Sequence, residues 1–270
     1  MTTQQPKSTP LQLSNRVAII SGGGTGIGRA AALAFTQQGA KVTLAGRRSK
    51  EIQEVADEIT AAGGEALPLV TDVTKEPDIQ RLVNETMAHY GRLDIAFNNA
   101  GILGSFRPIT EQTSADFDAV IATNLRGVWL SMKYQIEAFL AQGVAGTIVN
   151  TSSWLTHGAL AGSSAYSASK GALDAMIRAL VLEYGPKGIR INNINPGIID
   201  TPMARGGWND EAAFRPFVEH TPAKRAGLPE DAGDVAVWLS TDQARFVTGQ
   251  SILVDGGYTI AGLRVRDDAY

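Results

Sequence analysis

The sequence predicts an α/β protein, a single domain in which a doubly wound sheet of about seven parallel strands carries helices on both faces. Two observations predict this class: short apolar runs alternate with helical stretches along the chain, and a glycine-rich turn joins the first such pair. The length of 270 residues is within reach of one large α/β domain with a sizeable core.

Composition narrows the classes of partner. With 44% hydrophobic and 19% charged residues the chain is typical of a soluble globular protein, and its formal net charge of -3 gives no electrostatic reason to expect nucleic acid or an anionic membrane. The chain has no cysteine, which excludes disulfides and thiolate catalysis and fits a reducing cytoplasm. No apolar run approaches the ~18 residues of a membrane span. We therefore expect a cytoplasmic protein with a small-molecule substrate, no nucleic acid partner and no membrane partner.

The ends of the chain and its histidines give further expectations. Residues 1–13 are polar, contain two prolines and predict a flexible tail rather than a signal peptide or a membrane anchor. We expect the domain over 14–260 and a charged C-terminal extension over 261–270. The three histidines are too far apart to predict a metal site, so we expect no metal.

The first strand and helix predict a dinucleotide site of the Rossmann type. The apolar run Val17–Ile20 ends at Ser21, a glycine-rich turn over 22–28 follows, and an alanine-rich helical stretch runs from Arg29 to Gln38. Glycines let the backbone approach a pyrophosphate, and a helix N-terminus offers unpaired N–H groups and positive dipole charge to it. A bare glycine run would be only a flexible turn, but these flanking elements favour phosphate binding.

The second strand, Lys41–Ala45, ends in Gly46-Arg47-Arg48. Dinucleotide folds place a carboxylate near this strand end to bind the adenosine ribose, whereas arginine accommodates a 2'-phosphate. Because two arginines and no acid stand here, the sequence favours NADP(H), with NAD(H) as the other option. The alternative is that the two arginines only solvate the start of a helix.

The next elements continue the alternation. A helical stripe beginning at Ile52 is closed by Gly63-Gly64, and the third strand, Leu67–Val70, runs into Asp72 and Val73. A further amphipathic helix ends at Gly91, after which the fourth strand, Leu93–Phe97, leads into Asn98-Asn99-Ala100-Gly101. A long helical pattern, 117–139, follows and contains Asn124, a residue that competes for backbone hydrogen bonds and whose place in mid-helix needs a reason.

The fifth strand, Thr147–Thr151, leads to Ser152 and Ser153, at the strand end where open α/β sheets place their chemistry. Tyr166 and Lys170 are four residues apart, so on a helix they share a face. A nearby ammonium favours phenolate over phenol, and we therefore expect Lys170 to lower the pKa of Tyr166 and let it exchange a proton near neutral pH.

The last part of the domain begins with the sixth strand, Arg190–Ile194, which ends in a Pro-Gly turn, and a helix opening near Leu228 precedes a seventh strand starting at Ser251. Between Met203 and Ala223 no strong period appears. We expect three exposed aromatic residues in that segment: Trp208, Phe214 and Phe217.

The glycine spacing Gly22, Gly26 and Gly28, together with Tyr166 and Lys170 downstream, resembles the short-chain dehydrogenase/reductase family. The resemblance spans residues 14 to 260 and includes the Asn-Asn-Ala-Gly tetrapeptide and the separation of 13 residues between a serine and the tyrosine, which favours Ser153 over Ser152. The catalytic residues that this resemblance implies are Asn124, Ser153, Tyr166 and Lys170.

The resemblance also implies roles. Tyr166 exchanges the proton, Ser153 binds the substrate oxygen, Lys170 lowers the pKa of Tyr166 and binds the nicotinamide ribose, and Asn124 holds a relay water at a helix kink. A lid over about 203–223 and a homotetramer are expected. Thr25 stands where many NADP-preferring relatives carry a basic residue. The implied cofactor-binding residues are Gly22, Thr25, Gly26, Ile27, Gly28, Arg47, Arg48, Asp72, Val73, Asn99, Ala100, Gly101, Tyr166, Lys170, Pro196, Gly197, Ile199 and Thr201.

The substrate is less sharply specified. The residues next to these positions suggest an apolar pocket, which fits a cyclic or aryl ketone; His157 is either a substrate contact or an idle loop histidine. The same motifs would support a 3-oxoacyl-[acyl-carrier-protein] reductase. Such an enzyme needs a basic surface to bind its acidic carrier protein, and the pair Lys224-Arg225 is a weak candidate for that surface. A catalytically silent nucleotide-binding regulator is the third reading, against which the presence of both Tyr166 and Lys170 argues. The expected substrate-contacting residues are Ser153, Trp154, Leu155, Leu160, Ile198 and Trp208.

Overall fold

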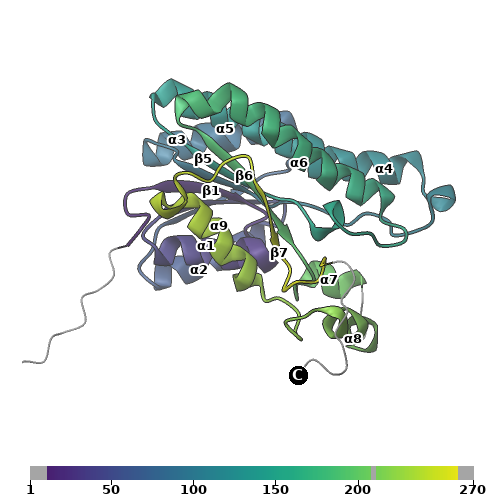
Figure 1. The fold of residues 1–270 in the computed structure, drawn as a ribbon. Coiled ribbons are helices and arrows are strands. Elements are labelled where there is room, and N and C mark those ends of the chain that lie inside the picture. Colours follow the sequence, from purple (N-terminus) through teal and green to yellow (C-terminus); the bar gives the residue numbers. More distant parts are fainter. Residues whose placement is uncertain (1–10, 208–210, 261–270) are drawn as a thin grey trace, which may run out of the picture.

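A computed structural model describes residues 11–207 and 211–260, and it shows a seven-stranded, fully parallel sheet (Figure 1). The strand order is β3-β2-β1-β4-β5-β6-β7, as the predicted doubly wound class requires. The strands are β1 (Val17–Ser21), β2 (Lys41–Gly46), β3 (Ala66–Val70), β4 (Ile95–Asn98), β5 (Thr147–Thr151), β6 (Arg190–Pro196) and β7 (Ser251–Val254).

Helices cover both faces of the sheet (Figure 1). One face carries a core of buried residues from α1, α2 and α9, and the other carries a second core from α3, α5 and α6. The helices are α1 (Gly26–Gln37), α2 (Ser49–Ala61), α3 (Glu76–Tyr90), α4 (Ser114–Ile121), α5 (Gly127–Gln142), α6 (Ser164–Tyr184), α7 (Pro202–Gly207), α8 (Glu211–His220) and α9 (Pro229–Ser240).

The strand order reverses direction between β1 and β4. The chain winds outward from β1 through β2 to β3, returns to β4 beside β1, and then winds the other way. At such a point neighbouring loops diverge and leave a crevice at the carboxyl ends of the strands, where α/β proteins bind ligands. The fold therefore places the glycine turn after β1 beside the tetrapeptide after β4.

The single helix expected over 117–139 is interrupted. A π-helical turn over Ala122–Arg126 separates α4 from α5, and it contains the completely buried Asn124. A π-turn widens the helix by one residue, and such turns are frequent at functional sites. The prediction that Asn124 disturbs a helix is therefore confirmed in its position.

The segment between Met203 and Ala223 is more ordered than its sequence indicates. It contains α7 and α8 in place of an irregular loop, and Phe214 is 2% exposed, so its predicted exposure is wrong. Phe214 packs with Trp154, Leu155 and Ile198 in a small cluster of its own. The expected Trp208 lies outside the described residues.

Packing begins before the expected domain boundary. Leu13, at the end of the segment predicted to be a flexible tail, is 1% exposed, and its N–H donates to the carbonyl of Gln38 at 2.9 Å. Its side chain joins the core under α1. The predicted tail is therefore too long at this end, while residues 1–10 lie outside the described part. In that part no helix is long and apolar enough to cross a membrane.

Candidate active site

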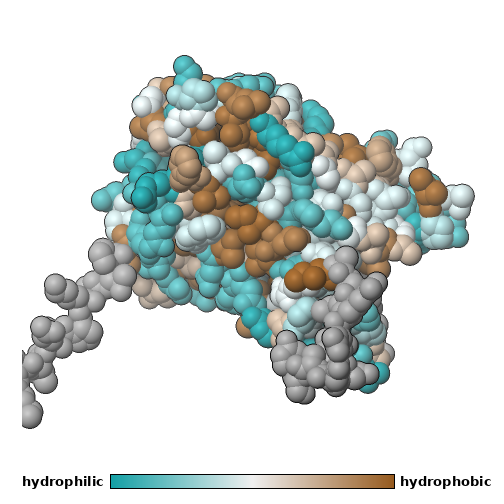
Figure 2. All heavy atoms as spheres, viewed as in Figure 1, coloured by the Kyte–Doolittle hydropathy of each residue, from teal (hydrophilic) through white to brown (hydrophobic). Residues whose placement is uncertain are grey.

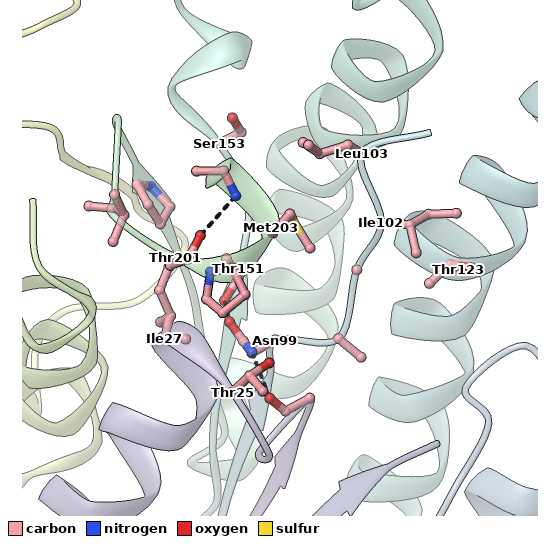
Figure 3. Close-up of a pocket in the computed structure, with 18 of the residues that line it drawn as sticks. Thr25, Ile27, Asn99, Ile102, Leu103, Thr123, Thr151, Ser153, Thr201 and Met203 are labelled. Carbon is pink, nitrogen blue, oxygen red and sulfur yellow. Dashed lines mark hydrogen bonds between the residues drawn. The ribbon is translucent and has the colours of Figure 1, made fainter. Parts of the chain in front are cut away.

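One cavity of about 680 Å³ opens at the carboxyl ends of the strands and runs from the glycine turn to the region of Tyr166. Figure 3 shows Thr25, Ile27 and Asn99 around one end of it, with Ser153, Leu103 and Met203 around the other. Most of the site residues expected from the sequence line this cavity. The exceptions are Gly28, Asn124 and Trp208: Gly28 packs against the backbone of Gly22, Asn124 is buried behind the cavity wall, and Trp208 lies outside the described residues.

The glycine turn is built for close approach. Gly22 and Gly26 have φ of 68° and 53°, a left-handed conformation that side chains with a Cβ rarely adopt. A Cβ added at Gly28 would overlap the carbonyl oxygen of Gly22, so this position admits only glycine. The turn leads directly into α1, whose first two residues, Gly26 and Ile27, line the cavity. This cradle fits the pyrophosphate of a dinucleotide.

The end of β2 supplies positive charge to the same part of the cavity. Arg47 and Arg48 are both exposed at the cavity, and Arg48 donates to the Thr25 hydroxyl at 3.2 Å and pairs with Glu51 at 3.2 Å. Arg47 instead acts on Asp72, whose pKa is below its ordinary value: burial raises it, but hydrogen bonds from Thr74 and the charge of Arg47 outweigh burial. Arg48 thus forms an ion pair with Glu51, whereas Arg47 acts through its charge on Asp72.

The tetrapeptide after β4 joins the two halves of the cavity. The Ser21 hydroxyl accepts hydrogen bonds from the backbone N–H groups of Asn99 and Ala100, at 3.0 Å and 3.1 Å. The Asn99 side chain accepts from the Thr151 hydroxyl at 3.1 Å. These bonds tie β1, β4 and β5 together at the cavity floor, and they hold the cavity wall in a fixed position.

Ser153 and Tyr166 meet at the other end of the cavity. The Ser153 hydroxyl accepts from the N–H of Leu155 at 3.2 Å and hydrogen-bonds with the phenol of Tyr166. Ser152 faces away, because its hydroxyl donates to the carbonyl of Lys170 at 3.2 Å. The geometry therefore favours Ser153 over Ser152 as the partner of Tyr166, as the spacing predicts.

The pKa of Tyr166 moves in the direction opposite to the prediction. Burial raises it to about 12, and the hydrogen bond with Ser153 only partly opposes burial. Lys170 is itself buried, which lowers its pKa to about 8 despite the nearby charge of Asp174. Its ammonium lies 5.7 Å from the centre of the Tyr166 ring and donates to the carbonyl of Thr151 at 2.7 Å. Desolvation thus outweighs the pairing that the sequence indicates.

Asn124 connects the π-helical turn with the loop after β4. Its side chain accepts from the N–H of Ile102 at 2.9 Å and donates to the carbonyl of the same residue at 2.8 Å. It also lies 3.3 Å from the Ser169 hydroxyl, next to Lys170. Its amide oxygen would lie 3.2 Å from a Cβ at Gly101, so it is packed against the cavity wall. Asn124 therefore fixes the wall beside Lys170.

The wall around Tyr166 is apolar. Trp154, Leu155 and Ile198 are buried there, and Phe106 packs on Tyr166 with ring centres 6.1 Å apart. Sequence reasoning missed several lining residues near Tyr166 because the segments that carry them show no period. They include Ile102, Leu103, Gly104 and Phe106 in the loop after β4, and Met203 and Ala204 on α7.

Three residues whose role the sequence left open, His157, Lys224 and Arg225, do not line the cavity. His157 is exposed, bonded to the Thr156 hydroxyl at 2.8 Å, and does not line the cavity. Arg225 is bound to Asp231, and Lys224 donates to the carbonyl of Glu219 at 3.0 Å, so the basic pair is largely engaged within the fold. No group of three or more potential metal ligands occurs in the described part of the chain.

Comparison with known proteins agrees with this arrangement. The protein-family model described as enoyl-(acyl carrier protein) reductase matches residues 22–259. The sequence is 38% identical over 248 residues to cyclohexanol dehydrogenase of Acinetobacter sp. (strain SE19), covering 92% of this chain and 96% of the relative. It is 36% identical over 250 residues to 2,5-dichloro-2,5-cyclohexadiene-1,4-diol dehydrogenase of Sphingobium indicum, covering 92% and 98%. The structure of levodione reductase matches with a TM-score of 0.89 at 35% identity, over 93% of this chain and 100% of that one.

Proposed function

Because this chain belongs to the short-chain dehydrogenase/reductase family, we propose that it transfers a hydride between NADP(H) and a cyclic or aryl ketone or secondary alcohol. Family membership makes the protein an oxidoreductase of CH–OH and C=O groups that uses a nicotinamide nucleotide. The proposed reaction site and substrate class rest on one observation. A single cavity connects the glycine turn with Tyr166 and Ser153, and its wall near these two residues is apolar.

The residues at the cradle end fit a dinucleotide. Gly22, Gly26 and Gly28 leave room for the pyrophosphate, and Asp72 and Val73 line the cavity just after β3. The preference for NADP(H) rests on Arg47, which is exposed at the cavity, whereas Arg48 is shared with Glu51. Arg47 would bind the 2'-phosphate, and NAD(H) would lack this contact.

At the other end the chain supplies proton transfer and orientation. When bound, the nicotinamide supplies or accepts the hydride. Tyr166 donates its phenol proton to the carbonyl oxygen as the ketone becomes an alcohol, and Ser153 donates a hydrogen bond to the same oxygen. Such a bond to an oxygen gaining negative charge contributes about 3 kcal/mol in comparable sites. Lys170 places a positive charge beside Tyr166 and stabilises the phenolate that is left.

The apolar wall indicates the kind of substrate. Trp154, Leu155, Ile198 and Phe106 present hydrocarbon surface next to Tyr166, and the lining side chains near it carry no charge apart from Lys170. A ring ketone buries its carbon skeleton there while its one oxygen meets Ser153 and Tyr166. Two relatives are named for cyclic alcohols, cyclohexanol and a cyclohexadiene diol, and the matching structure is named for levodione.

The direct test is a panel assay at 340 nm. Cyclic, aryl and open-chain ketones, a sugar, and a 3-oxoacyl thioester of acyl carrier protein are each offered with NADPH and with NADH. We expect the highest kcat/KM for a cyclic or aryl ketone with NADPH. Turnover confined to the carrier-bound thioester would assign the 3-oxoacyl reductase reaction instead, and binding of nucleotide without any turnover would point to a regulator.

A further inference from the structure

A row of buried amide side chains crosses the middle of the sheet. Asn98, Asn150 and Asn193 lie side by side on β4, β5 and β6, in direct register, and each is at most 2% exposed. Asn98 donates to Asn150 at 3.0 Å, and Asn150 donates to Asn193 at 3.0 Å. The interior of a parallel sheet is normally apolar, so three amides there need a reason.

The row ends at a carboxylate on α6. Asn193 donates to one oxygen of Asp174 at 2.9 Å, and Asn195 donates to the other at 3.0 Å. Burial raises the pKa of Asp174, but hydrogen bonds from Asn195, Thr156 and Asn193 outweigh burial and hold it below the ordinary value. Asp174 is therefore ionised in the core, and the amide donors of the row point toward its charge.

The groups that hold Asp174 also hold the backbone of Ser153. The side-chain N–H of Asn195 lies 3.1 Å from the carbonyl oxygen of Ser153, and the Thr156 hydroxyl donates to that oxygen at 3.0 Å. Asn195 and Thr156 also contact each other at 2.7 Å. The side-chain oxygen of Asn195 is buried and has no partner among the described residues. The hydrogen bonds of its nitrogen therefore set the orientation of the Asn195 side chain, although its oxygen is left without a donor.

Asp174 also lies one helical turn after Lys170 on the same face of α6. Both are buried, at 8% and 3% exposed, and the charge of Asp174 opposes the loss of the lysine proton. The other described groups packed around Asp174 are uncharged, namely Asn193 and Asn195 of β6, Ser251 of β7 and Thr156. Two further titratable residues lie close in the chain and are exposed: His157, which bonds to Thr156, and Arg178, one turn after Asp174 on α6.

We propose that Asp174 is a positioning residue of the acid–base centre. It holds the Ser153 backbone through Asn195 and Thr156, and it supplies the negative charge one turn from Lys170. The inference rests on the proposed function in so far as Ser153 and Lys170 act in catalysis; the contacts of Asp174 do not depend on it.

Substituting Asp174→Asn removes the charge and keeps the shape. We expect kcat for ketone reduction at pH 7 to fall at least about 10-fold while KM changes less than about 3-fold, because orientation and charge are lost but the apolar wall is intact. The pH at which half of the activity is lost on the alkaline side should fall by about one unit. If Asp174→Asn does not fold, Asp174→Ser is measured in its place.

Two further variants separate the roles. Asn195→Ala removes the bridge to Ser153 and keeps the carboxylate, so kcat should fall without a shift of the alkaline midpoint. Gln135→Met is the matched control at the far end of the row, where Gln135 donates to Asn98 at 2.8 Å. It should lower the melting temperature and leave both kcat and the midpoint as in the wild type. A shift of the midpoint in Gln135→Met would show that general destabilisation moves it, which would overturn the proposal.

A readout that needs no turnover tests the charge directly. The protein is labelled with [ε-¹³C]lysine, the Lys170 signal is assigned with Lys170→Arg, and its titration is followed by NMR. We expect a midpoint lower by about one unit in Asp174→Asn and an unchanged midpoint in Asn195→Ala. An unchanged midpoint and pH profile in Asp174→Asn would overturn the proposal. If the wild type turns over no ketone or alcohol, the proposed function fails, while this titration still decides the effect of Asp174 on Lys170.

Discussion

Burial shifts the pKa values of Tyr166 and Lys170, the two residues proposed to act in proton transfer, in opposite directions. It raises the pKa of Tyr166 to about 12 and lowers the pKa of Lys170 to about 8. Tyr166 therefore keeps its proton at every pH at which the protein would ordinarily be assayed, so it is poised as an acid. The protonated phenol is the form that can donate a proton to a ketone oxygen.

Substituting Tyr166→Phe removes the acid and leaves the ring. We expect kcat for ketone reduction to fall at least about 100-fold, the lower range for general acid–base catalysis. The dissociation constant of NADPH, measured by fluorescence titration, should change little. Tyr184→Phe, at the last residue of α6, which is partly buried against the core, is the matched control. Near-normal turnover in Tyr166→Phe would remove Tyr166 from the mechanism.

The pH dependence of reduction follows from Lys170. A cation whose pKa is lowered carries its charge below that pKa and loses it as the pH rises through it, so the charge beside Tyr166 is present below about pH 8. We expect kcat at saturating ketone to be level from pH 6 to 7 and to fall with a midpoint near pH 8. Thermal unfolding at each pH checks that the protein stays folded. A rate that is flat to pH 9.5 would contradict this.

Cofactor preference is expected to depend on Arg47. Substituting Arg47→Asp replaces a partner of the 2'-phosphate by a group that repels it, so KM for NADPH should rise more than KM for NADH. Lys50→Asp is the control: it makes the same change of charge at the start of α2, at a residue that does not line the cavity. Equal changes of the two constants in Arg47→Asp would count against Arg47 as the specificity residue.

At the scale of elements, the sequence predicted the strands and helices with a regular apolar pattern, and the site residues with a fixed spacing. All seven strands were expected within three residues of their observed starts, and Ser153 was chosen from its distance to Tyr166. The pKa of Tyr166 was not predictable, because it depends on burial by loops that have no period. Phe106 was missed for the same reason, and α8 was missed because Pro216 inside it conceals its helical pattern.

The glycine turn gives a prediction at this scale. Substituting Gly28→Ala places a Cβ against the carbonyl of Gly22, so the turn and the start of α1 must move. We expect the affinity for NADPH to fall at least about 10-fold, since each 1.4 kcal/mol lost is tenfold. Gly171→Ala on α6, where a Cβ meets nothing within 4 Å, should leave affinity unchanged and stabilise the helix by up to about 1 kcal/mol.

At the scale of the molecule, one face presents apolar side chains to solvent. Figure 2 shows them gathered over the region of α9 and β7, and β7 is an edge strand of the sheet. Phe246 is 100% exposed, Leu182 of α6 is 80% exposed and Leu253 of β7 is 39% exposed. An edge strand with apolar neighbours is a surface that another chain can cover. The homotetramer expected from the sequence stays a prediction, with a second copy at this face.

That assembly is tested by Phe246→Ser. We expect light scattering after size exclusion to show a smaller species than the wild type, because the most exposed aromatic residue of the described part, in the segment between α9 and β7, is lost. Ile109→Ser, at a residue 74% exposed before α4, is the matched control and should leave the mass unchanged. A wild type that is monomeric at micromolar concentration would contradict the assembly itself.

The apolar cluster of Trp154, Leu155, Ile198 and Phe214 is separate from the two large cores on the faces of the sheet. Its members come from loops and from α8, while the glycine cradle rests on α1 and the strands. Selection can therefore change which alcohol fits without disturbing the half that binds the nucleotide.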